Sequence, residues 1–191
     1  MFVFHFLFSI LYSTEKYIVK DFQKRYPNVI KDAKVGFMSP HKDAMENPSY
    51  RQVCSGTTGH VEVLNVELTD EACQTPEVYT ELIKFFFMFH DPTTLNRQGN
   101  DVGTQYSSIV FTTSQEQYDI ANSIKEELQS FINTKVVTSY SEKTVHTGIV
   151  DYTKFYPAHE EHQEYLMKNP NGYCNHRYRF KTWPETKKSE L

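Results

Sequence analysis

The first apolar stretch, MFVFHFLFSILY, fills residues 1–12 and is broken only by His5 and Ser9. A secretory signal peptide would need basic residues at its start, and this stretch has none. A membrane helix would need about 20 apolar residues. The composition therefore favours a buried strand. An incorrectly assigned start of the gene remains open as a second interpretation.

The rest of the chain alternates between the apolar spacing of helices and that of strands. Ser13 or Thr14 is expected to cap the first helix, and Ser114 with Gln117 is expected to form a capping box for the third. Helices are predicted at residues 13–25, 75–89, 114–131 and 158–168, and strands at residues 29–38, 60–68, 107–113 and 135–140. Interspersed helices and strands without repeats predict a sheet with helices packed on it, in an α+β or α/β domain.

Composition narrows the classes of function. A chain of 191 residues is one domain of ordinary size, and a net charge of −4 with a pI near 6.1 gives no reason to expect a nucleic-acid partner. The three cysteines, Cys54, Cys73 and Cys174, form no C-x-x-C pair. This argues against a disulfide scaffold or a zinc site and fits a reducing compartment.

The long polar segment from His90 to Tyr106, HDPTTLNRQGNDVGTQY, has no hydrophobic period. Loops of this length inside compact domains are usually functional or disordered. Its Asp, Asn, Gln and Thr residues suggest an ordered loop held by side-chain hydrogen bonds.

Glu62 is the most informative carboxylate. Residues two apart in a strand share a face, so Glu62 projects with Leu64, Val66 and Leu68. Burial on an apolar face disfavours the charged form and raises the pKa of a carboxyl, which suits a proton donor. A glutamate at an open strand end that reaches water or a lysine is an equally good interpretation of the pattern alone.

Other candidates carry less weight. His159 and His162 lie three residues apart, unlike the four of a zincin helix, so a solvated helix face is favoured over a metal site. The phenylalanines of residues 85–89 are expected in the core. The basic tail after residue 174 is expected to be a surface strap, with a partner contact as the alternative. Cys174 ends a turn-rich segment and is either an inert packing residue or a thiol that reaches another sulfur.

Three stretches together resemble the methionine sulfoxide reductase A family. They are NPSYRQVCSGTTGHVEV (Asn47 to Val63), the polar segment from His90 to Tyr106, and FYPAHEEHQEYLMKNPNGYC (Phe155 to Cys174). The resemblance spans roughly residues 14–174, which we interpret as one domain over residues 1–174 followed by a basic tail over residues 175–191. It implies a ferredoxin-like α+β sandwich. It also implies reduction of the S epimer of methionine sulfoxide, in proteins or as the free amino acid, without a bound cofactor or metal.

The resemblance also assigns roles to residues. Glu62 matches the acid that protonates the sulfoxide oxygen, and Tyr50 and Tyr106 match the phenols that hydrogen-bond it. Asp101 matches a carboxylate that orders the site, and Cys174 matches the cysteine that recycles the enzyme by forming a disulfide, which thioredoxin reduces.

One motif of the family is missing from the sequence. The family has Gly-Cys-Phe-Trp-Gly before the first helix, whereas aligning Glu15 with the family's glutamate places Ile10 at the nucleophilic cysteine. Leu11 and Tyr12 then stand where Phe and Trp form the pocket for the substrate methyl group. Without that thiolate the reaction lacks its nucleophile.

Two hypotheses follow. Either the gene encodes a peptide-methionine (S)-S-oxide reductase of which this sequence carries an atypical start, or the chain is a methionine-sulfoxide-binding or interaction protein without turnover. For both we expect a monomer in the cytoplasm, with no membrane or nucleic-acid partner. Sulfoxide-containing proteins or the free amino acid are the expected ligands, and thioredoxin is the expected reductant of an active form.

Overall fold

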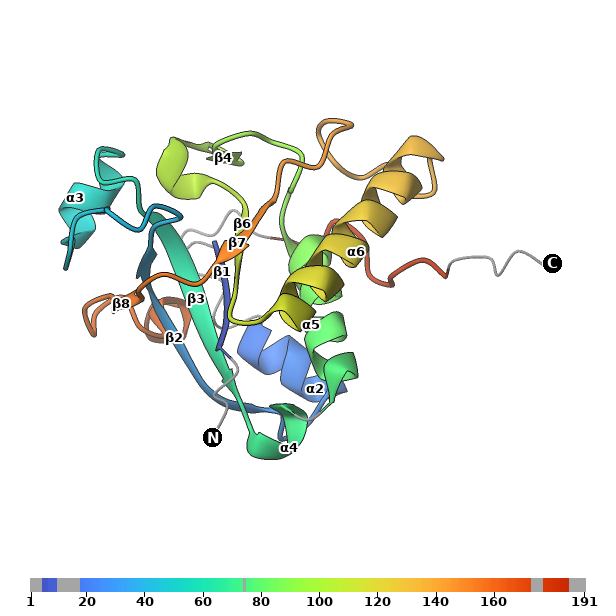
Figure 1. Cartoon of the computed structure of the whole chain (residues 1–191), viewed down its shortest axis with the longest axis horizontal. Coiled ribbons are helices and arrows are strands. Elements are labelled where there is room, and N and C mark those ends of the chain that lie inside the picture. Colours follow the sequence, from blue (N-terminus) through green and yellow to red (C-terminus); the bar gives the residue numbers. More distant parts are fainter. Residues whose placement is uncertain (1–4, 10–17, 74, 173–176, 186–191) are drawn as a thin grey trace.

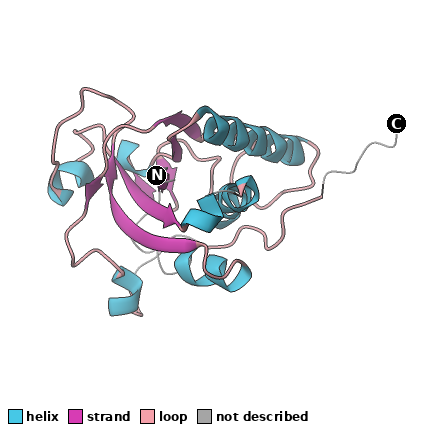
Figure 2. Ribbon diagram, turned by 60° about the horizontal axis from the view of Figure 1, so that its bottom comes forward, coloured by secondary structure: helices cyan, strands magenta, loops and turns pink. Residues whose placement is uncertain are grey.

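The computed structural model describes residues 5–9, 18–73, 75–172 and 177–185. The strands lie side by side in the molecule, and the long helices lie together on one side of them (Figure 1, Figure 2). The strands are β1 (His5–Ser9), β2 (Ile30–Met38), β3 (Val61–Leu68), β4 (Arg97–Gln98), β5 (Asp101–Val102), β6 (Ile109–Thr112), β7 (Gly148–Asp151) and β8 (Tyr156–Pro157). The helices are the π-helical turn η2 (Ile18–Phe22), α2 (Gln23–Arg25), α3 (Tyr50–Cys54), α4 (Asp70–Cys73), α5 (Pro76–Phe89), the 3-10 turn η3 (Thr104–Tyr106), α6 (Gln115–Asn133) and α7 (Tyr165–Lys168).

Within the described residues the main sheet has the strand order β7-β6-β1-β3-β2-β8. Its central strands β6-β1-β3-β2 pair antiparallel, and β7 adds to β6 in parallel. A helical segment follows β1, and α5 lies between β3 and β6 in the chain. This is the β-α-β-β-α-β order of a ferredoxin-like sheet, so the expected α+β sandwich is confirmed.

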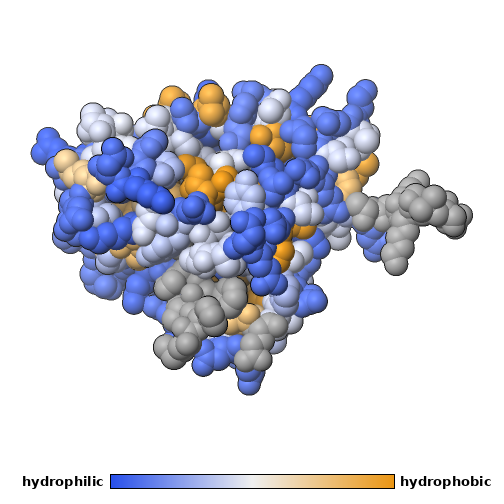
Figure 3. Space-filling view, in the orientation of Figure 1, coloured by the Kyte–Doolittle hydropathy of each residue, from blue (hydrophilic) through white to orange (hydrophobic). Residues whose placement is uncertain are grey.

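The helices cover one face of the sheet because α5 is apolar almost all round. Eight of its residues are buried, and Phe85, Phe86 and Phe87 are at most 2% exposed, so this run is core, as predicted. The side chains of β3 alternate as expected. Leu64, Val66 and Leu68 belong to the main core beneath the helices, whereas Val61 and Val63 pack in a smaller cluster on the opposite face. The face of the molecule in Figure 3 is mostly hydrophilic, with scattered hydrophobic residues. Within the described parts of the chain, no helix combines the length and hydrophobicity needed to span a membrane.

Most predicted elements are confirmed within one or two residues, but the strand predicted at residues 135–140 is wrong. The amides of Val136 and Val137 both bond to the Phe131 carbonyl, and Lys135 has a left-handed backbone (φ 60°). These bonds close the end of α6, so the apolar pair terminates a helix. The edge strand is instead β7, further along the chain.

Two other local predictions need correction. The helix predicted at residues 158–168 is only α7, because the Gln163 side chain bonds to both the amide and the carbonyl of Val35 at 2.9 Å and fixes the preceding residues against β2. The capping box of α6 is half formed. Ser114 accepts from the Gln117 amide, but the Gln117 side chain turns to the Thr113 amide. The caps expected at Ser13 or Thr14 lie outside the described residues.

Candidate active site

The start of β3 places Glu62 in the interior of the protein. Glu62 pairs with Phe37 on β2. The next residue of β3, Val63, pairs with Ser9, the last residue of β1. Glu62 is 2% exposed, and no residue that the structure describes hydrogen-bonds its Oε2 atom. Burial, and secondarily the charge of Asp101, raise the pKa of Glu62 to about 8. The carboxyl is therefore neutral at pH 7 and has a proton to give.

Helix α3 positions Tyr50, although no helix was predicted there from the sequence. Ser49 caps the helix and forms a capping box with Gln52, a signal of S-x-x-Q spacing that was present in the sequence but overlooked. The Tyr50 ring lies 4.4 Å from the His162 ring, centroid to centroid, and 6.5 Å from that of Phe37. Burial, a hydrogen bond to the Cys54 thiol and the nearby Glu62 carboxylate raise the pKa of Tyr50, which keeps its phenol protonated.

Tyr106 approaches from the polar segment. It ends η3, and the side chain of its neighbour Gln105 donates to the Cys54 carbonyl at 3.1 Å, which ties η3 to α3. Burial and the charges of Glu62, Cys54 and Asp101 raise the pKa of Tyr106 to about 12. Asp101, on β5, is half-buried and close enough to influence the carboxyl of Glu62. Glu62, Tyr50, Tyr106 and Asp101 are therefore near enough to one another for their charges to interact.

The polar segment is ordered by its own hydrogen bonds, as predicted. Asp91, 1% exposed, accepts from the amide and hydroxyl of Thr93 and from the amide and hydroxyl of Ser141. The Gln98 side chain returns a bond to the Asp91 carbonyl at 2.8 Å. The loop is therefore a rigid support for η3.

Four residues named from the sequence cannot be placed. Ile10, Leu11, Tyr12 and Cys174 lie outside the described residues. Cys54, which the sequence offered only as one of three thiols, lies beside Tyr50 on α3 and is a site residue that sequence reasoning missed. The signal was its spacing of four from Tyr50, which places both on one side of a helix.

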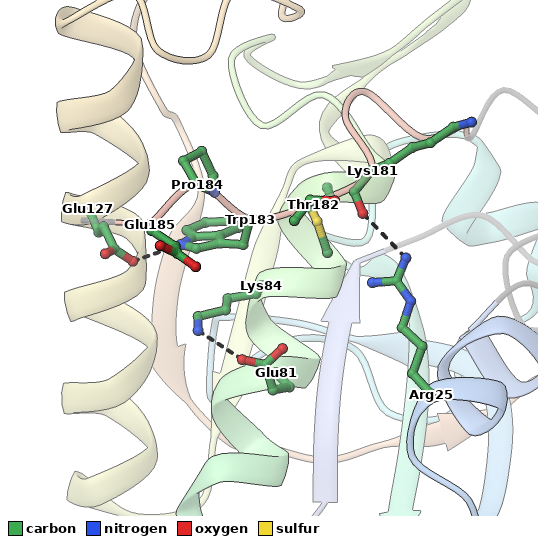
Figure 4. A pocket seen from close by; sticks show the side chains of 10 residues that line it. Arg25, Glu81, Lys84, Glu127, Lys181, Thr182, Trp183, Pro184 and Glu185 are labelled. Carbon is green, nitrogen blue, oxygen red and sulfur yellow. Dashed lines mark hydrogen bonds and ion pairs between the residues drawn. The ribbon is translucent and has the colours of Figure 1, made fainter. Parts of the chain in front are cut away.

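Neither His162 nor the cavity beside the C-terminal tail adds a metal-binding or acidic group to this site. His162 is half-buried against Tyr50, and burial lowers its pKa. Among the described residues there is no group of three or more His, Cys, Asp or Glu side chains able to hold a metal ion. A cavity of about 770 Å³ lies between α2, α5, α6 and the tail, where Trp183 donates to Glu127 (Figure 4). It contains none of the residues grouped around Glu62.

A buried neutral acid and two protonated phenols converge as hydrogen-bond donors. Such a set binds an oxygen that accepts hydrogen bonds strongly, and it can protonate that oxygen as negative charge develops there.

Comparison with known proteins points in the same direction. The family model described as peptide methionine sulfoxide reductase matches residues 17–190. A probable peptide methionine sulfoxide reductase of Schizosaccharomyces pombe is 42% identical over 127 residues, which is 66% of this chain and 68% of that protein. A mitochondrial peptide methionine sulfoxide reductase of Mus musculus is 44% identical over 140 residues, 73% of this chain and 55% of that protein. The crystal structure of reduced Mxr1 from Saccharomyces cerevisiae superposes with a TM-score of 0.71 at 32% identity, covering 90% of this chain and 88% of the other.

Proposed function

Because the chain belongs to the peptide methionine sulfoxide reductase family, we propose that it binds the S epimer of methionine sulfoxide and reduces it slowly with thiols as reductant. The observation that carries the proposal is the buried, neutral Glu62, whose Oε2 has no partner among the described residues, beside the Tyr50 and Tyr106 phenols. A sulfoxide oxygen is a strong hydrogen-bond acceptor, and it would supply the partner that the protonated Glu62 lacks at Oε2.

In this proposal the chain's own groups do the following. Tyr106 donates its hydrogen bond to the sulfoxide oxygen, with Tyr50 close by. Glu62 transfers its proton to that oxygen as the sulfur–oxygen bond breaks, so that no free oxide is released. Asp101 helps keep the Glu62 proton in place, because its negative charge disfavours ionisation of the acid. The product is the thioether of methionine.

Slow turnover is part of the proposal because Ile10 stands where the resemblance expects the nucleophilic cysteine. The second candidate, a binding protein without turnover, rests on the same observation. The variant Ile10→Cys/Leu11→Phe/Tyr12→Trp restores the family motif. We expect it to raise the rate of methionine formation by at least tenfold if the rest of the site folds as described.

The test begins with binding. A peptide with methionine-S-sulfoxide is titrated calorimetrically into the protein, with the R-sulfoxide peptide and the methionine peptide as controls. We expect binding of the S epimer alone, and at least tenfold slower methionine formation by Glu62→Gln at pH 7, because the amide keeps the size of the acid and can donate a hydrogen bond but has no acidic proton to transfer. Equal binding of all three peptides would overturn the proposal. Methionine formation with dithiothreitol then separates the reductase from the binding protein.

The partners and the compartment are proposed on weaker support. Thioredoxin is proposed as the reductant because disulfides formed in such a cycle need a dithiol to reopen them. A cytoplasmic location is proposed because the three cysteines form no disulfide-type pattern, which fits a reducing compartment. A monomer that acts in oxidative protein repair is proposed from membership of the family. The mouse relative is mitochondrial by name, so fractionation of cells expressing the protein tests the compartment.

A further inference from the structure

We propose that Arg97, Arg177 and Arg179 form a subsite for the side-chain carboxylate of an acidic residue in the peptide that carries the methionine sulfoxide. This inference rests on the proposed function and adds a preference for substrate sequence to it. The three arginines line a cavity of about 590 Å³ between the polar segment, residues 141–142 and the tail.

The tail segment Arg-Tyr-Arg-Phe, residues 177–180, alternates basic and aromatic side chains. Its aromatic residues pack against the main core, where the Tyr178 ring lies 5.2 Å from the Phe89 ring, centroid to centroid. The Arg179 amide donates to the Met88 carbonyl at 2.8 Å. These contacts fix the backbone of the segment, so its two arginines are held at the wall of the cavity.

The three guanidinium groups have N–H donors to spare, since each carries five. The side chain of Arg179 is 12% exposed, its Nη1 lies 3.6 Å from the Asp91 Oδ2, beyond hydrogen-bond distance, and its buried Nε has no hydrogen-bond partner among the described residues. Arg97 donates from Nε to the Gly99 carbonyl at 2.7 Å. Arg177 is exposed. A buried donor without an acceptor is unfavourable unless a ligand supplies one.

The charges around the cavity favour an anion. Its acids are Asp91, which already accepts four hydrogen bonds from Thr93 and Ser141, and the exposed Glu142. The three guanidinium groups outnumber these two carboxylates, in a chain whose net charge is −4. A carboxylate suits them because a guanidinium group can bind both of its oxygens through two parallel N–H bonds.

The cavity lies next to the proposed sulfoxide site. Asn96, the neighbour of Arg97, accepts from the Gly103 amide at 2.9 Å and from the Ser107 hydroxyl at 2.7 Å. Those two residues flank η3, which carries Tyr106. The strand that contributes Arg97 is therefore fixed to the turn that contributes the phenol.

A peptide with its sulfoxide oxygen at Tyr106 can reach the cavity with a side chain a few residues away, because an extended chain advances about 3.3 Å per residue. Leu95 lines the same cavity and is 66% exposed. It offers an apolar surface to the methylene groups of a glutamate whose carboxylate binds the arginines. The subsite therefore favours protein substrates in which an acidic residue lies close to the methionine sulfoxide.

The first experiment measures how binding depends on peptide charge. One glutamate is moved through an otherwise uncharged peptide, on either side of methionine-S-sulfoxide, and each peptide is titrated calorimetrically into the protein beside its glutamine and lysine counterparts. We expect one position at which glutamate binds about fivefold more tightly than glutamine, and lysine more weakly than either. Added sodium chloride should reduce this preference because it screens the charges.

Charge reversal tests the arginines themselves. Arg177→Glu reverses one charge of the cavity at an exposed position, and we expect the lysine peptide to bind this variant more tightly than the glutamate peptide. Arg97→Glu should shift the preference in the same direction. The matched control is Lys20→Glu, since Lys20 is an exposed residue of η2 that does not line the cavity, and it should keep the wild-type preference. Each preference is a ratio between two peptides on one protein, so differences in the folded fraction cancel.

The outcomes separate this inference from the proposed function. Binding of the S-sulfoxide peptides without regard to charge overturns the subsite but leaves the proposed function standing. A preference for glutamate that Arg177→Glu and Arg97→Glu both leave unchanged also overturns it, because the carboxylate then binds elsewhere. Binding of none of the peptides would overturn both.

Discussion

Glu62 and Asp91 are two carboxyl groups of nearly equal exposure, 2% and 1%, with opposite surroundings. Asp91 accepts four hydrogen bonds from Thr93 and Ser141, and an Arg179 nitrogen lies 3.6 Å away. Burial alone would raise the pKa of Asp91, but these bonds outweigh it and the pKa is lowered. No described residue donates to Glu62 Oε2, and burial raises the pKa of Glu62 to about 8.

The difference shows that the number of donors around a buried carboxyl decides what it does. Asp91 is held charged and organises the polar segment, so it contributes to stability. Glu62 is kept neutral and reactive at the expense of stability, which is typical of functional sites. Four predictions test this contrast.

The largest effect is expected for Asp91→Ala. The change leaves the donors of Thr93 and Ser141 and the charge of Arg179 without their buried acceptor. Loss of one partner of such a network destabilises by about 3–5 kcal/mol. The free energy of unfolding from urea titration measures it, with Asp43→Ala, an exposed position, as the control. Equal stability of the two variants would mean that Asp91 does not organise the loop.

Glu62→Gln should increase the free energy of unfolding, whereas Asp91→Ala should decrease it. The pKa of Glu62 is raised in the folded protein, so the unfolded chain releases its proton first and folding stability falls as the pH rises from about 4.5 toward 8. An amide does not ionise, so the variant should be about 1–3 kcal/mol more stable than wild type at pH 8. The gain should shrink at pH 5. Urea titrations at both pH values measure the difference in stability. A variant that is less stable than wild type at pH 8 would contradict the raised pKa of Glu62.

His90 should produce a smaller effect on the acid side. It is 1% exposed, its ring nitrogens bond to the Phe86 carbonyl and the Ser108 hydroxyl, and burial lowers its pKa to about 4. The unfolded chain therefore binds a proton first, and stability falls as the pH drops from about 6.5 toward 4, by at most about 1.4 kcal/mol per pH unit. Replacement by Gln should flatten the slope of unfolding free energy against pH in this window. An unchanged slope would assign the acid sensitivity to other groups.

The smallest effect is expected for Gly103→Ala. Gly103 has φ 147°, and an added Cβ would lie 2.3 Å from the Gln105 Oε1 atom. We expect a loss of about 1 kcal/mol in stability and weaker binding of the S-sulfoxide peptide, because Gln105 positions η3. Gly148→Ala is the matched control, since its nearest contact would be an ordinary 3.7 Å. If the two changes weaken binding equally, Gln105 does not help to position Tyr106.

Much of the fold follows from local sequence. The alternation in β3 and the apolar run of α5 each identify an element and its buried face. The strand at the edge of the sheet could not be identified from local sequence. Val136 and Val137 look like a strand, yet they close α6, because the Phe131 carbonyl takes both of their amides. Such capping depends on how the helix ends in space and leaves no periodic signal.

The candidate site, like the fold, can be predicted from the sequence only where residue types and spacing carry a local signal. The face that Glu62 occupies and the ordered nature of the polar segment could be inferred from residue types and spacing. The position of α3 next to β3 could not, because the capping box of Ser49 and Gln52 marks where this short helix begins but not where it packs. The fixed position of η3 likewise depends on one amide, that of Gln105, which is indistinguishable in the sequence from any other polar loop residue.

The bonds of Asp91 also bear on when the site forms during synthesis. Its partners Ser141 and Arg179 lie 50 and 88 residues downstream, and the ring beside Tyr50 belongs to His162. The groups that we propose to bind and protonate the ligand lie in the first 106 residues, but these contacts form with residues in the last third of the chain. Ribosome-bound chains that end near residue 135 should therefore contain the core strands without an ordered loop, and would not bind the sulfoxide until the remainder emerges.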